Sequence, residues 1–182
     1  MKDTYTLEVA GLKRELKICP VNESLSIAGF IMFGDTELTV ACGVELLEKA
    51  PMHDVIVTAE SKGIPIAYEM ARQGCNDYIV ARKSVKLYMK EPEKVTVKSI
   101  STEDEQTLYL DSNETDKIRN KRVLIVDDVI STGESLKALE TLVANFGGNI
   151  VGKAAVLAEG DAAERDDIIF LEKLPLFIKS RN

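Results

Sequence analysis

Short apolar runs alternate along the chain with segments of helical periodicity, and this alternation constrains the fold more than any other feature of the sequence. The runs have the length of buried strands: Asp54–Thr58, Tyr78–Ala81, Val123–Val126 and Ile150–Leu157. Strands that are separated by helices run parallel, and a parallel sheet needs helices on both faces. The sequence therefore predicts an α/β fold with a central parallel sheet flanked by helices.

Three helices are expected between and before these strands. The first can begin at Asp35 or Thr36, because either side chain can act as the N-cap. Its buried face is predicted to carry four apolar residues: Val40, Ala41, Val44 and Leu47. The second helix begins near Ile64, and the third runs from about Glu134 to Phe146, where a Gly-Gly pair ends it. The apolar stripe of the third helix belongs to the core.

The composition indicates one globular domain with small-molecule partners. A chain of 182 residues with 45% hydrophobic content can bury one sizeable core and is short for two domains. Its net charge is −7, from 30 acidic and 23 basic residues, and its pI is near 4.9. Such a charge disfavours nonspecific attraction to nucleic-acid phosphates, so we expect no nucleic-acid partner.

Histidine and cysteine are too few for several common kinds of site. His53 is the only histidine, and Cys19, Cys42 and Cys75 are far apart in the sequence. This leaves little material for a structural zinc site, a Ser-His-Asp group or a Cys-His group. An odd number of unpaired cysteines fits a reducing cytoplasm. Because no apolar run suggests an export signal or a membrane span, we expect a cytoplasmic protein without a membrane partner.

The segment Val123–Ser135 has the layout of a sugar-phosphate site. A buried strand ends in Asp127 and Asp128, and a turn of small residues then opens a helix. Backbone N–H groups of such a turn and the positive end of the helix can cradle a phosphate dianion. Three hydroxyl groups add donors: Ser131, Thr132 and Ser135. The two carboxylates could hold ribose hydroxyls directly or through Mg²⁺ and its waters, although an isolated Asp-Asp pair more often only caps a turn.

The whole segment resembles the phosphoribosyl-pyrophosphate motif of the type I phosphoribosyltransferases: four apolar residues, two acidic ones, two variable ones and then Ser-Thr-Gly-x-Ser. The resemblance implies that Asp127 and Asp128 are catalytic and hold Mg²⁺. It also implies that the five residues of the turn bind substrate: Ser131, Thr132, Gly133, Glu134 and Ser135. Glu134 stands where the family often has glycine, so its carboxylate should point to solvent. The competing phosphate motifs GxxxxGK[ST] and GxGxxG do not occur.

Two further segments resemble parts of the same family. Val55–Gly63 resembles its pyrophosphate-binding loop, which implies four substrate-binding residues: Glu60, Ser61, Lys62 and Gly63. A glycine there lets the backbone approach oxygen atoms, and Lys62 supplies a point charge where many members have arginine. Arg82 and Lys83 match a basic pair that contacts pyrophosphate, frequently across a dimer interface. Without the phosphate motif downstream, residues 60–63 would be interpreted as an ordinary turn, and Arg82 and Lys83 as solvated charges.

The segments expected around the base resemble the family more loosely. Ser99–Leu108 resembles the catalytic loop, and Glu103 falls near the carboxylate that adenine phosphoribosyltransferases place beside the base. Ala28–Thr36 resembles their hood over the purine, with Phe33 as the stacking ring. The single domain 1–182 then divides into a hood with the first helix (1–50), a core (51–160) and a flexible two-stranded catalytic loop (83–110). By its residues alone the last segment could equally be a rigid hairpin.

The resemblance implies an enzyme of purine salvage that transfers the phosphoribosyl group of 5-phosphoribosyl-1-pyrophosphate to a purine base, with Mg²⁺ as cofactor and a homodimer as assembly. The hood favours adenine. Gly160, however, would pack thinly on the second face of the ring, which keeps hypoxanthine, guanine and xanthine open. A non-catalytic regulator that senses the phosphoribosyl compound is a further alternative. It would need a DNA-binding module, and the residues before Asp54 hold no basic recognition helix.

Overall fold

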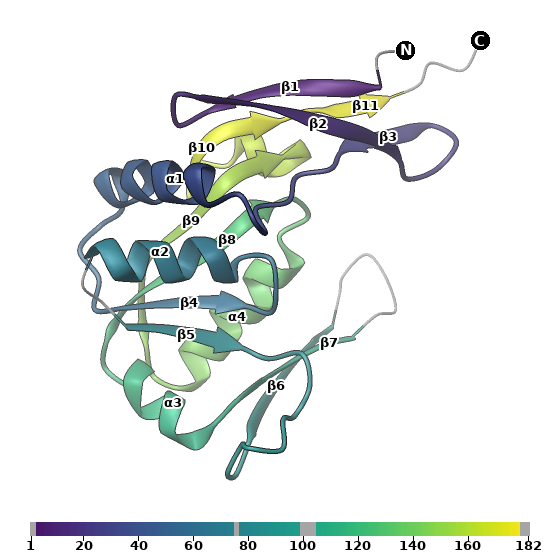
Figure 1. Ribbon diagram of the computed structural model, residues 1–182. Helices are drawn as coiled ribbons and strands as arrows, with labels where there is room; N and C mark the ends of the chain where they lie inside the picture. Colours follow the sequence, from purple (N-terminus) through teal and green to yellow (C-terminus); the bar gives the residue numbers. More distant parts are fainter. Residues whose placement is uncertain (1–2, 75–76, 99–104, 179–182) are drawn as a thin grey trace.

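The computed structural model describes residues 3–74, 77–98 and 105–178 (Figure 1). Its central sheet has five parallel strands: β4 (Val55–Ala59), β5 (Asp77–Ala81), β8 (Arg122–Ile130), β9 (Asn149–Glu159) and β10 (Ile169–Leu174). Their order across the sheet is β10-β9-β8-β4-β5. The predicted α/β fold with a central parallel sheet is therefore confirmed.

Helices cover both faces of this sheet, and each face has its own apolar cluster. Helices α1 (Thr36–Lys49) and α2 (Ile64–Gly74) lie on one face, and α4 (Glu134–Asn145) lies on the other (Figure 1). Because side chains alternate along a strand, Val55 and Val57 of β4 pack on the α4 side while Ile56 packs on the side of α1 and α2. Strands buried on both faces account for the continuous apolar runs in the sequence.

The face that α1 buries differs from the predicted one. Asp35 is the N-cap, and its carboxylate accepts a hydrogen bond from the N–H of Leu38 at 3.1 Å, as expected. Five residues are buried: Leu38, Thr39, Cys42, Gly43 and Leu46. Val40 and Val44 are each 43% exposed, so the predicted face was wrong at these two positions, whereas Leu47 is partly buried against the core. Gly43 lies on the face of α1 that packs against α2. Glu69 Cγ and Gln73 Nε2 of α2 are each 3.1 Å from the point that a β-carbon of Gly43 would occupy.

The other helices begin close to the predicted positions, and one helix was not predicted. α2 begins at Ile64, and α4 runs from Glu134 with Phe146 as its C-cap. The additional helix is α3 (Ser112–Ile118), which begins with a capping box between Asp111 and Glu114. An Asp three residues before a Glu is a known start signal, so the sequence did contain the information.

A second sheet includes strands of the N-terminal segment predicted as the hood, and the two ends of the chain both contribute to it; we refer to this sheet as the hood. Its strands are antiparallel with the order β1-β2-β3-β11: β1 (Thr4–Val9), β2 (Leu12–Pro20), β3 (Leu25–Ala28) and β11 (Leu176–Ile178). Figure 1 shows the hood above α1 and β10. The Arg14 guanidinium of β2 holds Asp35 at 2.6 Å and Glu37 at 2.7 Å, which ties the hood to the start of α1.

The polar segment predicted as a two-stranded excursion forms the antiparallel hairpin of β6 (Glu93–Lys98) and β7 (Glu105–Leu110). Backbone hydrogen bonds join Arg82, just after β5, to Tyr109 of β7 in both directions, at 2.9 and 2.8 Å. The hairpin is thus anchored at the end of a central strand. Within the described ranges no helix has both the length and the apolar character needed to cross a membrane.

Candidate active site at the carboxyl edge of the sheet

Most of the predicted site residues follow the carboxyl ends of central strands. The loop Glu60–Gly63 follows β4, Arg82 and Lys83 follow β5, and the turn Ser131–Ser135 ends β8 and opens α4. These strand ends meet at one edge, because the strands are parallel and β8, β4 and β5 are neighbours. Ligands of open α/β sheets bind in the crevice outside this edge. The fold therefore brings together three segments that are far apart in the sequence.

The turn after β8 forms a hollow beside the start of α4. The hollow has a volume of about 270 Å³, including the part open to solvent, and it is lined by Asp127 and by residues 129–136. Gly133 is the N-cap of α4 with a φ of 78° and offers no side-chain hydrogen bond to the helix. The start of α4 thus lacks a side-chain cap, and the N-terminus of a helix is a favourable place for an anion. The Ser135 hydroxyl accepts a hydrogen bond from Gln106 of β7 at 3.3 Å, so the hairpin contacts the hollow.

Asp127 and Asp128 lie inside β8 and not at its end, which corrects the predicted strand boundary. β8 continues to Ile130 because it keeps pairing with β9, with Asp127 opposite Ala155 and Val129 opposite Leu157. Asp128 is 3% exposed, and its Oδ2 has no hydrogen-bond partner among the described residues. Burial, and next the charge of Asp128, raise the pKa of Asp127 well above its ordinary range. Asp127 is half-buried and Asp128 is buried, and a cation bound beside them would offset the repulsion between the two carboxylates.

The carboxylate pair fits the requirements of Mg²⁺. Carboxylate oxygens are ligands that this ion prefers, and Oδ2 of Asp128 is a buried acceptor without a donor. In the described part of the chain no group of three or more His, Cys, Asp or Glu side chains could hold a metal by itself. Magnesium commonly uses one or two carboxylates together with waters and substrate oxygens, which is compatible with a two-carboxylate site.

The loop after β4 lies against these carboxylates. Lys62 Nζ is 3.7 Å from Asp128 Oδ2. A β-carbon on Gly63 would overlap Thr58 Oγ1 and would lie 2.8 Å from Asp127 Oδ1, so only glycine allows the loop to come this close. The Glu60–Ser61 peptide bond is cis. The loop then enters α2, where the N–H of Ile64 donates to the carbonyl of Ser61 at 3.2 Å.

Glu60 faces the basic segment after β5. Its carboxylate accepts a hydrogen bond from the backbone N–H of Lys83 at 3.0 Å. It also lies 3.5 Å from Arg82 Nη1 and 3.4 Å from Lys86 Nζ. The N–H of Lys83 and then the charge of Lys86 hold the pKa of Glu60 below its usual range, against the effect of burial. Glu60 thus ties the loop after β4 to the end of β5.

Two predicted residues remain apart from this cluster of contacts. Phe33 lies in the loop between β3 and α1, and its side chain is 53% exposed. The loop opens α1, whose far end leads into β4, so Phe33 is at the same edge of the sheet as the carboxylates. Glu103 lies outside the described residues, and its predicted place beside the base stays a prediction.

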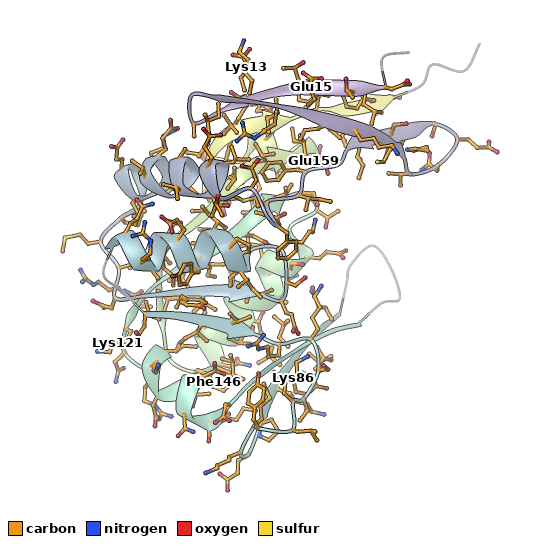
Figure 2. All side chains as sticks on the ribbon, viewed as in Figure 1. Lys13, Glu15, Lys86, Lys121, Phe146 and Glu159 are labelled. Carbon is orange, nitrogen blue, oxygen red and sulfur yellow. The ribbon has the colours of Figure 1, made fainter. Side chains whose placement is uncertain are left out.

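Two residues that no motif marked lie at the same edge. Glu159 ends β9, and burial raises its pKa while the nearby charge of Lys62 acts in the opposite direction. Figure 2 shows Glu159 toward the hood and Lys86 toward the hairpin. Arg165 follows the short helix η1 (Gly160–Glu164), and its Nη1 is 3.0 Å from the point that a β-carbon of Gly133 would occupy. An acidic residue at the end of an apolar run could have marked Glu159, whereas no local pattern marks Arg165.

Comparison with known proteins agrees with this arrangement. A model of the phosphoribosyl transferase domain matches residues 44–178. A hypoxanthine/guanine phosphoribosyltransferase of Methanococcus voltae is 38% identical over 112 residues, which are 62% of this chain and 56% of that protein. An adenine phosphoribosyltransferase of Oenococcus oeni is 31% identical over 125 residues, 67% of each chain. The match to the first relative thus spans little more than half of its length.

The fold is also shared with solved structures. The crystal structure of adenine phosphoribosyltransferase from Thermoanaerobacter pseudethanolicus has a TM-score of 0.69 and 21% identity, and the match covers 87% of this chain and 95% of that chain. At this level of identity the likeness concerns the fold. The family model, in contrast, spans well over half of the sequence and includes the loop after β4, the carboxylates and the turn after β8. The chain therefore belongs to the type I phosphoribosyltransferase family.

Proposed function

We propose that this protein transfers the phosphoribosyl group of 5-phosphoribosyl-1-pyrophosphate to a purine base, with adenine preferred, and releases a nucleoside monophosphate and pyrophosphate. Family membership supports the reaction class. The observation that carries the proposal is the meeting of two loops at the sheet edge, where Lys62 Nζ lies 3.7 Å from Asp128 Oδ2 beside the hollow of the β8 turn. One phosphorylated ribose with a pyrophosphate group would extend across both loops.

Each part of the substrate has a set of groups suited to it. The 5-phosphate would accept hydrogen bonds from the backbone of the β8 turn and from the hydroxyls of Ser131, Thr132 and Ser135. The ribose would lie over Asp127 and Asp128. The pyrophosphate would meet the start of α2 and the charges of Lys62 and Arg82, while Lys83 would extend toward the pyrophosphate of the second subunit. Glu60 would act indirectly, since its carboxylate orients the segment of Arg82 and Lys83.

The reaction breaks the bond between the anomeric carbon and the pyrophosphate oxygen and forms a bond from that carbon to a purine nitrogen. Positive charge builds on the ribose ring as the leaving group departs, and the carboxylates of Asp127 and Asp128 would stabilise it. Held by the same two residues, Mg²⁺ would supply positive charge to the pyrophosphate oxygens. The predicted role of Glu103 is to assist the movement of a proton on the base.

The preference for adenine is tested by comparing the four bases. An amino group at position 6 needs an acceptor and an oxo group needs a donor, and a mismatch leaves a buried polar group unpaired. We expect kcat/KM for adenine to exceed that for hypoxanthine, guanine and xanthine by at least about a hundredfold. Preference for a 6-oxopurine, as in the name of the Methanococcus voltae relative, would contradict the adenine assignment but not the transferase. Binding of the phosphoribosyl compound without turnover of any base would favour the regulator.

We also propose a homodimer in which the basic segment after β5 completes the partner's site. Arg82 is paired with Glu60 of its own chain, so the exposed Lys83 is the better candidate to reach across. Three large apolar side chains that follow this segment in the sequence are exposed, as an interface would require: Val85, Leu87 and Tyr88.

The shared site predicts complementation between two inactive variants. Subunits with Asp127→Asn and Asp128→Asn and subunits with Lys83→Ala should each be inactive, or nearly so, as homodimers. Coexpressed at equal levels, they should recover about a quarter of the wild-type activity, because half of the dimers are mixed and each mixed dimer has one intact site. Sedimentation would report the dimer. No recovery in mixed dimers, or a fully active monomer, would exclude the arrangement.

A further inference from the structure

The hollow at the start of α4 lacks a basic side chain of its own. The residues that line it, Asp127 and residues 129–136, include no Lys, Arg or His, whereas they include the carboxylate of Asp127. A phosphate dianion placed here meets the end of a helix, whose dipole is equivalent to roughly half a positive charge. That is less than the charge of the ligand and of the neighbouring carboxylates. To offset this excess of negative charge, a cation from another part of the chain would have to lie beside the hollow.

Lys62 lies on the side of Asp128, and Arg165 is the cation that the fold brings beside the turn at Gly133. Its Nη1 is 3.0 Å from the point that a β-carbon of Gly133 would occupy. The other side of the guanidinium is held by Asp167, since Nε donates to Oδ1 at 2.8 Å and Nη2 donates to Oδ2 at 2.7 Å. A planar guanidinium fixed through two bonds has a defined direction for its remaining nitrogen. That nitrogen is the one beside Gly133.

The position of Arg165 is further fixed relative to α4. Asp167 also accepts from Lys153 Nζ at 2.5 Å, and the same ammonium donates to Glu140 of α4 at 2.9 Å. Lys153 is 16% exposed, whereas Glu140 is 33% and Asp167 46% exposed, so this connection is partly shielded from solvent. The ion pairs link η1, β9 and α4, and they orient the guanidinium before any ligand arrives. A preoriented donor loses little freedom on binding.

We infer that Arg165 is a further binding residue for the substrate's 5-phosphate, to which its Nη1 donates a charged hydrogen bond. The inference rests on the proposed function, because it adds a residue to the same phosphate site. Gly133 fits this role as well, since any side chain there would have a strained φ and would stand against Nη1.

Separate titrations with two anions test the inference by calorimetry. Ribose 5-phosphate carries the group that Arg165 would contact, and pyrophosphate with Mg²⁺ carries the group assigned to Lys62. Arg165→Gln should bind ribose 5-phosphate about 10- to 100-fold more weakly, which is the range for one hydrogen bond to a charged group. It should bind pyrophosphate within about twofold of the wild type, because the two groups occupy separate loops. Lys62→Gln should show the reverse pattern, and Arg165→Lys should regain part of the lost affinity.

A matched control is Arg119→Gln, which removes an exposed arginine paired with Asp116 at 4.0 Å on α3 and should change neither titration. Unchanged affinity of Arg165→Gln for ribose 5-phosphate would overturn the inference. So would an equal loss for both anions accompanied by a lower unfolding temperature, since that pattern marks a purely structural arginine. If the wild type itself bound neither ribose 5-phosphate nor 5-phosphoribosyl-1-pyrophosphate, the proposed function would be contradicted. The wild-type titration therefore distinguishes a failure of the proposed function from a failure of the role assigned to Arg165.

Discussion

Replacing Asp127 and Asp128 together by asparagine should lower turnover by at least about a hundredfold and leave the protein folded. In the proposed complex both charges would lie beside the ribose and Mg²⁺, where positive charge develops during the reaction. Asparagine keeps the size of each side chain and removes its charge. Steady-state turnover with saturating base and 5-phosphoribosyl-1-pyrophosphate measures the loss, and near-normal turnover of the folded variant would refute the assignment of these residues.

The stability of the same variant should not fall, and its unfolding temperature at neutral pH should equal or exceed that of the wild type. Burial raises the pKa of Asp127 above the value in the unfolded chain, so the folded protein binds more protons between these two pKa values. The free energy of unfolding of the wild type therefore decreases as the pH rises between these two pKa values. Asparagine does not titrate, so the variant does not lose this stability. The opposing effect is the attraction of Asp128 to Lys62, which is small because Lys62 is 56% exposed and the charges are 3.7 Å apart.

The matched control for this variant removes two carboxylates elsewhere. Asp77 begins β5 at the amino edge of the sheet and is 70% exposed, and Asp116 on α3 is 80% exposed. Asp77→Asn with Asp116→Asn changes the net charge by the same amount and should keep wild-type turnover. A comparable loss of turnover in this control would mean that overall charge, and not the carboxylate pair, determines the rate.

Local sequence patterns predicted those parts of the fold that are set locally. The strand cores, the Asp35 N-cap and the start of α2 follow from neighbouring residues, and the structure has them where they were expected. The buried face of α1 was wrong because it depends on α2, which packs against Gly43 rather than against Val40 and Val44. The strand β11 was missed because its partner is β3 at the other end of the chain.

The site residues also fall into those that a local pattern indicates and those that depend on contacts between distant segments. The carboxylates and the phosphate turn lie in one continuous strand-turn-helix segment, so a single pattern could indicate them. Glu60 was expected beside substrate, and its pairing with Arg82 and Lys86 appears only once β4 and β5 are neighbours. Arg165 comes to Gly133 through ion pairs with Asp167 and Lys153, which no spacing in the sequence indicates.

Gly63→Ala should reduce kcat/KM for 5-phosphoribosyl-1-pyrophosphate by about a hundredfold and also destabilise the fold. The new β-carbon would overlap Thr58 Oγ1 and would lie 3.2 Å from the Cα of Asp127. The Cα of Asp127 is a backbone atom and cannot rotate away from the new β-carbon as a side chain could. The loop after β4 must therefore move away from β8. A displacement of about 1 Å of a positioning loop costs roughly a hundredfold in rate, and overpacking costs about 1–3 kcal/mol of stability.

Overpacking and loop displacement can be separated by a second crowded glycine that is remote from the site. A β-carbon on Gly152 of β9 would lie 2.9 Å from Pro51 Cγ and 3.0 Å from Leu124 Cδ1. Gly152→Ala should also lower the unfolding temperature and keep the wild-type kcat/KM per folded molecule. Gly63→Ala should lose activity even at temperatures where circular dichroism shows it fully folded. Wild-type kcat/KM of Gly63→Ala at such temperatures would mean that the displaced loop serves equally well. The close approach of Lys62 and Gly63 to the β8 carboxylates would then not be required for the reaction.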